Sequence, residues 1–84
     1  MADILYFARL AEALEIKSEE LELSAECKTV DDLVALLRKR GEPFASEFNG
    51  ETRILVAINQ EMSDPTAEIS NTDEIAFFPP VTGG

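Results

Sequence analysis

The stretch that most constrains the fold is residues 29–41, which carry the signals of one helix with defined ends. Thr29 can accept a hydrogen bond from a free amide of the first turn, and the two aspartates that follow complement the positive end of the helix dipole. Gly41 supplies the left-handed residue that commonly ends a helix. Apolar side chains recur at i, i+3, i+4 and i+7 and form one stripe, made of Val30, Leu33, Val34 and Leu37. Such a helix is expected to pack through this stripe on one face of a sheet.

Strand-forming segments lie on both sides of this helix. The predicted strands are residues 3–8, 20–24, 53–58, 61–62 and 74–78. Residues 10–15 predict a single helical turn, and residues 42–48 predict a loop or short turn. One helix cannot cover both faces of a sheet of about four or five strands, and the helix between the second and third strands is long enough for a crossover. The sequence therefore predicts one α+β domain over residues 1–84, a ubiquitin-like β-grasp with a mixed sheet and one main helix on one face.

The charge balance restricts the partners that such a domain can have. Seventeen acidic residues against seven basic ones give a net charge of −10 over 84 residues. This surface repels phosphate backbones and anionic lipid, so neither nucleic acid nor a membrane is an expected partner. The charge either steers the chain toward a basic protein surface or simply keeps a small protein soluble. The single Cys27 excludes an internal disulfide and fits a cytoplasmic location.

Residue types that carry most enzyme chemistry are missing from the sequence. The chain has no histidine and one cysteine, so nucleophile–histidine pairs and a zinc site are excluded. It also lacks a glycine-rich phosphate-binding motif. We therefore expect no metal or cofactor on this chain and interpret Cys27 as a small structural residue. The chemically distinctive group that remains is the carboxylate of Gly84.

Residues 79–84 are predicted to form an extended functional tail. Pro79 and Pro80 keep the chain extended, and Gly83 and Gly84 can enter a channel too narrow for side chains. The six residues could reach about 20 Å. A frayed terminus without a role is the simpler alternative. A functional carboxylate would need activation, most simply as an acyl-adenylate, and could then accept an amine, as in a protein tag, or a sulfur nucleophile, as in a sulfur carrier.

Residues 73–84 resemble the C-terminal signature of the small, sulfur-carrier subunits of molybdopterin synthase. Residues 4–12 are similar to the first strand and turn of that family, and residues 29–33 and 55–59 also fit. Thr72 departs from the pattern, because the family often has a turn glycine there. The resemblance covers essentially the whole chain.

This resemblance implies a mechanism and a set of partners. A ubiquitin-activating-like enzyme, using ATP and magnesium, would adenylate Gly84, and a sulfur donor protein would convert it to a thiocarboxylate. The tail would then enter the large subunit of the synthase and donate sulfur to cyclic pyranopterin monophosphate. Two sulfurs are needed per product, so a heterotetramer with two copies of each subunit is expected. The chain would not be catalytic alone.

The resemblance also assigns roles to individual residues. By position, Gly83 and Gly84 would carry the chemistry. The residues expected to guide the tail into its partner are Phe77, Pro79, Pro80, Val81 and Thr82. Phe7 and Phe78 are expected to pack in the core or at an interface. Two alternatives stay open: a sulfur carrier for thiamine synthesis or another pathway, and a ubiquitin-like protein modifier or binding module.

Overall fold

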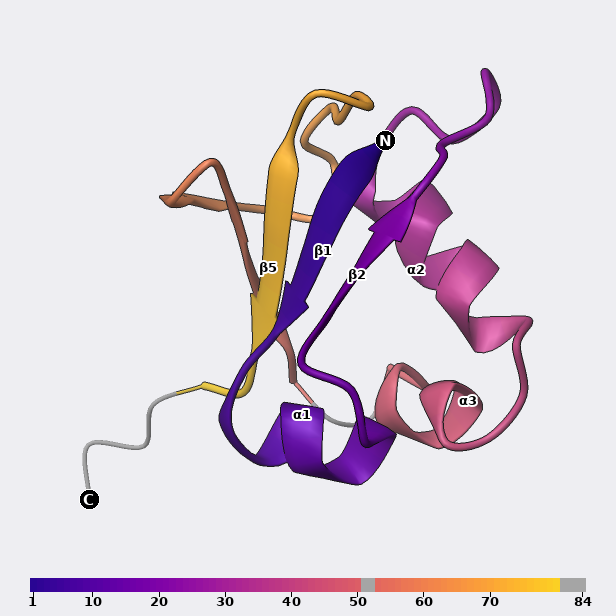
Figure 1. The fold of residues 1–84 in the computed structure, drawn as a ribbon, viewed down its shortest axis with the longest axis vertical. Helices are drawn as coiled ribbons and strands as arrows, with labels where there is room; N and C mark the ends of the chain where they lie inside the picture. Colours follow the sequence, from indigo (N-terminus) through magenta and orange to yellow (C-terminus); the bar gives the residue numbers. More distant parts are fainter. Residues whose placement is uncertain (51–52, 81–84) are drawn as a thin grey trace.

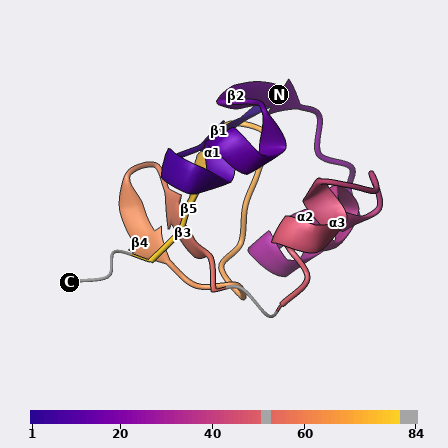
Figure 2. The ribbon, with the colours of Figure 1, turned by 90° about the horizontal axis from the view of Figure 1, so that it is seen from below.

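A five-stranded sheet organises the chain, and the computed structural model describes residues 1–50 and 53–80 of it (Figure 1). The elements are β1 (Ala2–Tyr6), α1 (Ala8–Leu14), β2 (Ser18–Leu21), α2 (Val30–Arg38), α3 (Phe44–Glu47), β3 (Leu55–Ile58), β4 (Glu61–Ser63) and β5 (Glu74–Phe78). The strand order is β2-β1-β5-β3-β4. Helices α2 and α3 lie on one face of the sheet, and α1 lies across the end from which the C-terminal segment leaves (Figure 2). None of the helices among the described residues has the length and apolar character needed to span a membrane.

The sheet is mixed, as predicted, although its parallel pair is not the one expected. The first and last strands, β1 and β5, run parallel, whereas the other neighbouring strands are antiparallel. The strands on either side of α2 along the chain, β2 and β3, are not neighbours in the sheet. The prediction of a crossover between those two strands was therefore wrong. The pairing of β1 with β5 joins segments from opposite ends of the chain, so the spacing of residues in the sequence does not reveal it.

The central helix begins where the sequence predicts. The Thr29 hydroxyl accepts a hydrogen bond from the Asp32 amide at 3.3 Å, and the Asp32 carboxylate accepts from the amides of Lys28 at 2.9 Å and Thr29 at 3.0 Å. These hydrogen bonds, from Lys28 first and then Thr29, lower the pKa of Asp32. The helix ends at Arg38, earlier than Gly41, which nevertheless has the expected positive φ of +88°.

The core lies between the sheet and the helices. Alternate residues of β1 and β5 face it, and the stripe of α2 covers them, except that Val34 is only partly buried. The largest fully buried side chains are Tyr6, Phe77, Ile4, Leu33, Leu37 and Ile75. Phe48, in the segment after α2, is also buried, as its apolar spacing with Phe44 predicts. This packing confirms the prediction of one main helix on one face of the sheet.

Several segments differ from their predicted extents. Strand β1 ends at Tyr6 instead of residue 8, β3 begins at Leu55 instead of residue 53, and β4 extends to Ser63 instead of residue 62. Helix α1 has seven residues instead of a single turn, because Leu10 and Leu14 both reach the core from it. Strand β2 begins and ends earlier than residues 20–24. Leu23 is buried but lies outside the strand, where the Asn71 side chain accepts from its amide at 2.7 Å and donates to its carbonyl at 3.2 Å. The side chain of Asn71 thus makes the hydrogen bonds that a neighbouring strand would make if the ladder continued to Leu23.

The turn before β5 explains why Thr72 is accepted where a glycine was expected. The Asp73 carboxylate accepts a hydrogen bond from the Ser70 amide at 2.8 Å, and the Asp73 amide donates to the Ser70 carbonyl at 3.1 Å. Thr72 does not adopt a positive φ. A residue with a Cβ therefore fits this turn without backbone strain.

Candidate functional site

The candidate site begins where the chain leaves the sheet at the end of β5. β5 is the central strand, with β1 on one side and β3 on the other. Its last residues are held from both sides, because the Phe7 amide donates to the Phe77 carbonyl at 3.1 Å and Leu55 pairs with Phe78. Pro79 and Pro80 follow and are partly buried. The segment that we call the tail therefore starts from a fixed point (Figure 1).

Four of the residues predicted to act in the tail lie outside the described residues. These are Val81, Thr82, Gly83 and Gly84. Their roles stay predictions from the sequence.

Phe77 requires a correction, because it was expected to guide the tail and instead belongs to the core. Its side chain is 1% exposed. It stacks with the ring of Tyr6 at a centroid distance of 6.2 Å and meets the ring of Phe48 edge-on at 5.2 Å. Successive residues of a strand point to opposite faces, so Phe77 faces the helices and Phe78 faces away from them. Phe77 can anchor the start of the tail, but its side chain is not available to a partner.

A chain of polar contacts supports this aromatic cluster. The buried Tyr6 hydroxyl donates to the Glu19 carboxylate at 2.8 Å, and the Arg40 guanidinium donates to both Glu19 oxygens at 2.9 Å. Arg40 also lies over the ring of Phe44 at 4.9 Å. The network joins the end of α2 to β1 and β2. Sequence reasoning missed it, because 21 residues separate Glu19 from Arg40 and no local spacing signals the pair.

The electrostatics of this network follow from burial and hydrogen bonding. Burial, and then the hydrogen bond to Glu19, raises the pKa of Tyr6, so the hydroxyl stays protonated. Burial alone would raise the pKa of Glu19, but the hydrogen bonds from Arg40 and Tyr6 outweigh it and the pKa lies below its ordinary value. Glu19 therefore stays charged and holds both partners.

The opposite face of the sheet, which we call the open face, has no helix over it among the described residues (Figure 2). Phe7, which is 48% exposed, and the partly buried Phe78 lie on this face at the end where the tail begins. Met62 on β4 is 63% exposed. Exposed aromatic and aliphatic side chains beside a tail suit a protein interface. The expectation that Phe7 and Phe78 are interface residues is compatible with these positions.

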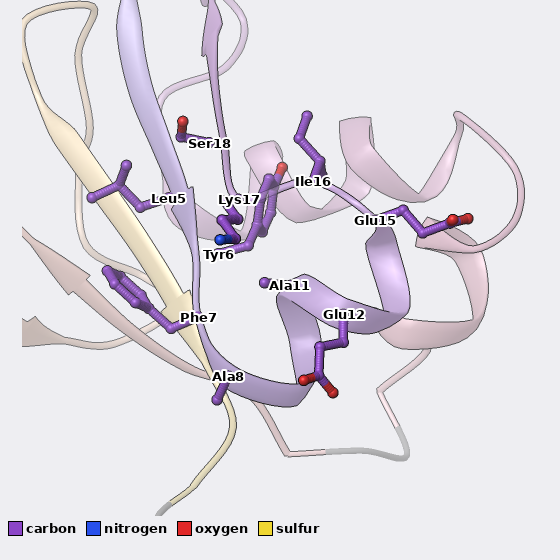
Figure 3. Close-up of a pocket in the computed structure, with 10 residues that line it drawn as sticks. All are labelled: Leu5, Tyr6, Phe7, Ala8, Ala11, Glu12, Glu15, Ile16, Lys17 and Ser18. Atoms are coloured by element: carbon purple, nitrogen blue, oxygen red, sulfur yellow. The ribbon is translucent and has the colours of Figure 1, made fainter.

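A hollow of about 740 Å³, which we call the α1 hollow, lies between β1, the start of β2 and helix α1. Figure 3 shows Leu5 and Phe7 on one side of β1 and Tyr6 on the other. Helix α1 contributes Ala8, Ala11 and Glu12 to the lining, and Glu15, which caps the helix, also lines the hollow. The hollow adjoins the start of the tail, since Phe7 lines it and bonds to Phe77.

The described part of the chain presents few reactive groups. Burial, followed by the nearby Asp32 charge, raises the pKa of the Cys27 thiol, which disfavours the reactive thiolate. Within residues 1–50 and 53–80, no three histidine, cysteine, aspartate or glutamate side chains are grouped so that they could hold a metal ion.

A mixed sheet in this order, with helices on one face and a C-terminal segment leaving the central strand, is the architecture of a β-grasp protein. The ThiS family model matches residues 4–84, and the chain belongs to the ThiS family.

Comparison with known proteins agrees with the resemblance read from the sequence. The chain is 34% identical to the molybdopterin synthase sulfur carrier subunit of Haemophilus influenzae, over 84 residues that cover both proteins completely. It is similar to a putative molybdopterin converting factor subunit 1 from Pyrococcus furiosus, with a TM-score of 0.75, 28% identity, and coverage of 95% of this chain and 97% of that one. It is also similar to SAMP1, a small archaeal modifier protein of Haloferax volcanii, with a TM-score of 0.76, 28% identity, and coverage of 99% and 98%.

Proposed function

We propose that this chain is the sulfur-carrier subunit of a molybdopterin synthase and acts in molybdenum cofactor biosynthesis. The observation that carries the proposal is the full-length similarity to a protein of that name in Haemophilus influenzae. The start of the tail supports it, because β5 fixes the point from which the end of a carrier would reach another active site. The exposed Phe7 and the partly buried Phe78 beside that point offer an apolar contact for the receiving protein.

The chemistry proposed at Gly84 has three steps. The terminal carboxylate attacks the α-phosphorus of ATP on an adenylating enzyme, which also supplies the magnesium, and pyrophosphate leaves. A sulfide equivalent from a sulfur donor protein attacks the acyl-adenylate carbonyl, AMP leaves, and the thiocarboxylate forms. In the large subunit, the thiocarboxylate sulfur attacks a carbon of cyclic pyranopterin monophosphate and displaces an oxygen substituent. Water then cleaves the resulting thioester, which leaves the sulfur on the pterin and the carboxylate on Gly84. Glycine allows each attack because no side chain crowds the carbonyl.

The body of the chain contributes binding and orientation. Phe77 anchors the end of β5 in the core, so Pro79 and Pro80 direct the last residues from a defined position. The net charge of −10 favours association with basic protein surfaces. Because each product needs two sulfurs, we propose a heterotetramer with two carriers and two large subunits.

A second candidate function is that of a protein modifier, which the similarity to SAMP1 favours. A modifier would undergo the same adenylation, but its activated carbonyl would be attacked by a lysine amine of another protein. The two functions differ in the nucleophile and not in the fold. Only the product of the reaction separates them.

Intact-mass analysis tests the proposal. The chain is incubated with ATP, magnesium, an adenylating enzyme and a sulfur source, and we expect a sulfur-for-oxygen mass gain at the C-terminus. Addition of the large subunit and cyclic pyranopterin monophosphate should then reverse the gain and produce molybdopterin. Isopeptide-linked adducts without any thiocarboxylate would favour the modifier. A thiocarboxylate that does not react with the pterin would indicate a carrier for another pathway.

A further inference from the structure

Two hollows meet at one cross-strand pair on the open face. The α1 hollow and a second hollow of about 350 Å³ are both lined by Leu5 and Ser18, which are partners in the β1–β2 ladder. Together they form a trough along β1 and β2, from α1 toward the other end of the sheet. Strand residues advance by about 3.3 Å each, so Phe7 at one end and Asp3 at the other are about 13 Å apart.

The two ends of this trough differ in chemistry. The end at α1 has mainly apolar walls, which include Phe7 and Ala11, and the charged residues Glu12, Glu15 and Lys17 complete its lining. The other end is lined by Asp3, Glu19, Glu20 and Glu74. Glu19 is paired with Arg40, whereas Asp3 is the ladder partner of Glu20 on one side and of Glu74 on the other. Like charges directly opposite each other in a sheet are destabilising. Asp3, Glu20 and Glu74 thus form an acidic row across β2, β1 and β5.

The chain does not neutralise this row within its described part. The ion pair found among residues 1–50 and 53–80 is that of Arg40 with Glu19, which involves none of the three. The described carboxylates are also not grouped so that they could hold a metal ion. A long organic cation, such as a lysine or arginine side chain, can reach along a row of spaced carboxylates and is the fitting counterpart.

We propose that the trough binds an extended segment of the large subunit that carries an aliphatic or aromatic side chain at the α1 end and a lysine or arginine at the Asp3 end. This inference rests on the proposed function. A separation of about 13 Å corresponds to residues i and i+4 of an extended segment, whose side chains point to the same side. The α1 end adjoins the start of the tail, so the subunit that receives the tail can occupy the trough at the same time. A hollow with mainly apolar walls suits a lasting subunit contact better than a transient one.

Calorimetric titration of the full chain with the purified large subunit, at low and at moderate salt, tests this inference. The double variant Asp3→Asn/Glu74→Gln should raise Kd about tenfold and reduce its salt dependence, because it removes the charges that the cation meets. Its thermal stability should be equal to or above that of the wild type, since a repulsion is removed. Ser18→Trp, which occupies the junction of the hollows and keeps the acidic row, should also weaken binding.

The matched control is Glu26→Gln/Glu68→Gln, which removes the same charge from exposed positions away from the trough. Its Kd should stay within about twofold of the wild type. If the control and the trough variants lose the same affinity for the large subunit, the effect comes from net charge alone and the inference is overturned. A loss confined to binding of the adenylating enzyme would overturn the choice of the large subunit. Failure of the wild type to gain a thiocarboxylate or to bind the large subunit would overturn the proposed function itself.

Discussion

The two faces of the sheet are built from alternate residues of the same strands, yet they differ in how far their side chains are exposed. On β1, Tyr6 is 2% exposed and faces the helices, whereas the next residue, Phe7, is 48% exposed on the open face. On β5, Phe77 is buried and Phe78 is only partly buried. Neighbouring aromatic residues are thus divided between the core and the open face. The division follows from the period of two in a strand and not from residue type.

The covered face is expected to determine stability, and the open face with its tail is expected to determine function. Full burial of an aromatic side chain contributes about 1.5–3 kcal/mol, which an exposed one does not. A change on one side of the sheet should therefore affect one property and spare the other.

Deletion of Gly84 should have the largest effect on function. We expect thiocarboxylate formation and molybdopterin production to be lost, because the carboxylate that remains belongs to Gly83 and lies one residue short. The free energy of unfolding, measured by urea denaturation, should change by less than about 0.5 kcal/mol, since terminal residues contribute little packing. Unfolding of the domain on this deletion would contradict the separation of body and tail.

The pair Phe77→Ala and Phe78→Ala tests the division directly. Phe77→Ala should lower the free energy of unfolding by about 3–5 kcal/mol, because it leaves a cavity among Tyr6 and Phe48. Phe78→Ala should lower the free energy of unfolding by clearly less than Phe77→Ala. It should weaken binding of the large subunit instead. Urea denaturation and calorimetric titration on both variants give the two readouts. Similar stability losses in the two would contradict the assignment of faces.

Glu19→Gln should lower stability by about 1–2 kcal/mol, because two charge-assisted hydrogen bonds from Arg40 are lost at a partly exposed site. The pKa of Glu19 is lowered in the folded state, so its contribution is complete above the ordinary value of 4.5 and is lost as pH falls through the folded value. The stability difference between the wild type and the variant should therefore shrink in acid. Glu22→Gln, at an exposed position, is the control and should show no such trend.

Thr29→Ala should have the smallest effect of the four. Loss of the hydroxyl that caps α2 should cost about 1 kcal/mol, measured by urea denaturation. Because the cap lies on the covered side, affinity for the large subunit should be unchanged. A change in affinity without a change in stability would place α2 in the interface.

Much of the architecture could be predicted from local pattern. Strand β5 has the predicted bounds, and Thr29 caps α2 as expected. These features depend on residues close together in the sequence. The parallel pairing of β1 with β5 and the ion pair of Glu19 with Arg40 could not be predicted, because they join segments that only folding brings together.

Prediction of the candidate site was limited for the same reason, since part of it depends on contacts between segments far apart in the sequence. The tail stays a prediction from the sequence, whereas the side to which Phe77 points was predicted wrongly. The trough was also not foreseen, since the acidic row exists only through the register of three strands.

The sequence by itself determined the helix, the strand segments and the Gly-Gly end, because hydrophobic period, capping and backbone freedom act over a few residues. Only the tertiary structure decided which strands adjoin, which aromatic ring is buried and where the acidic side chains of separate strands meet. Those outcomes depend on long-range packing, in which every strand must satisfy its hydrogen bonds and bury one face at the same time.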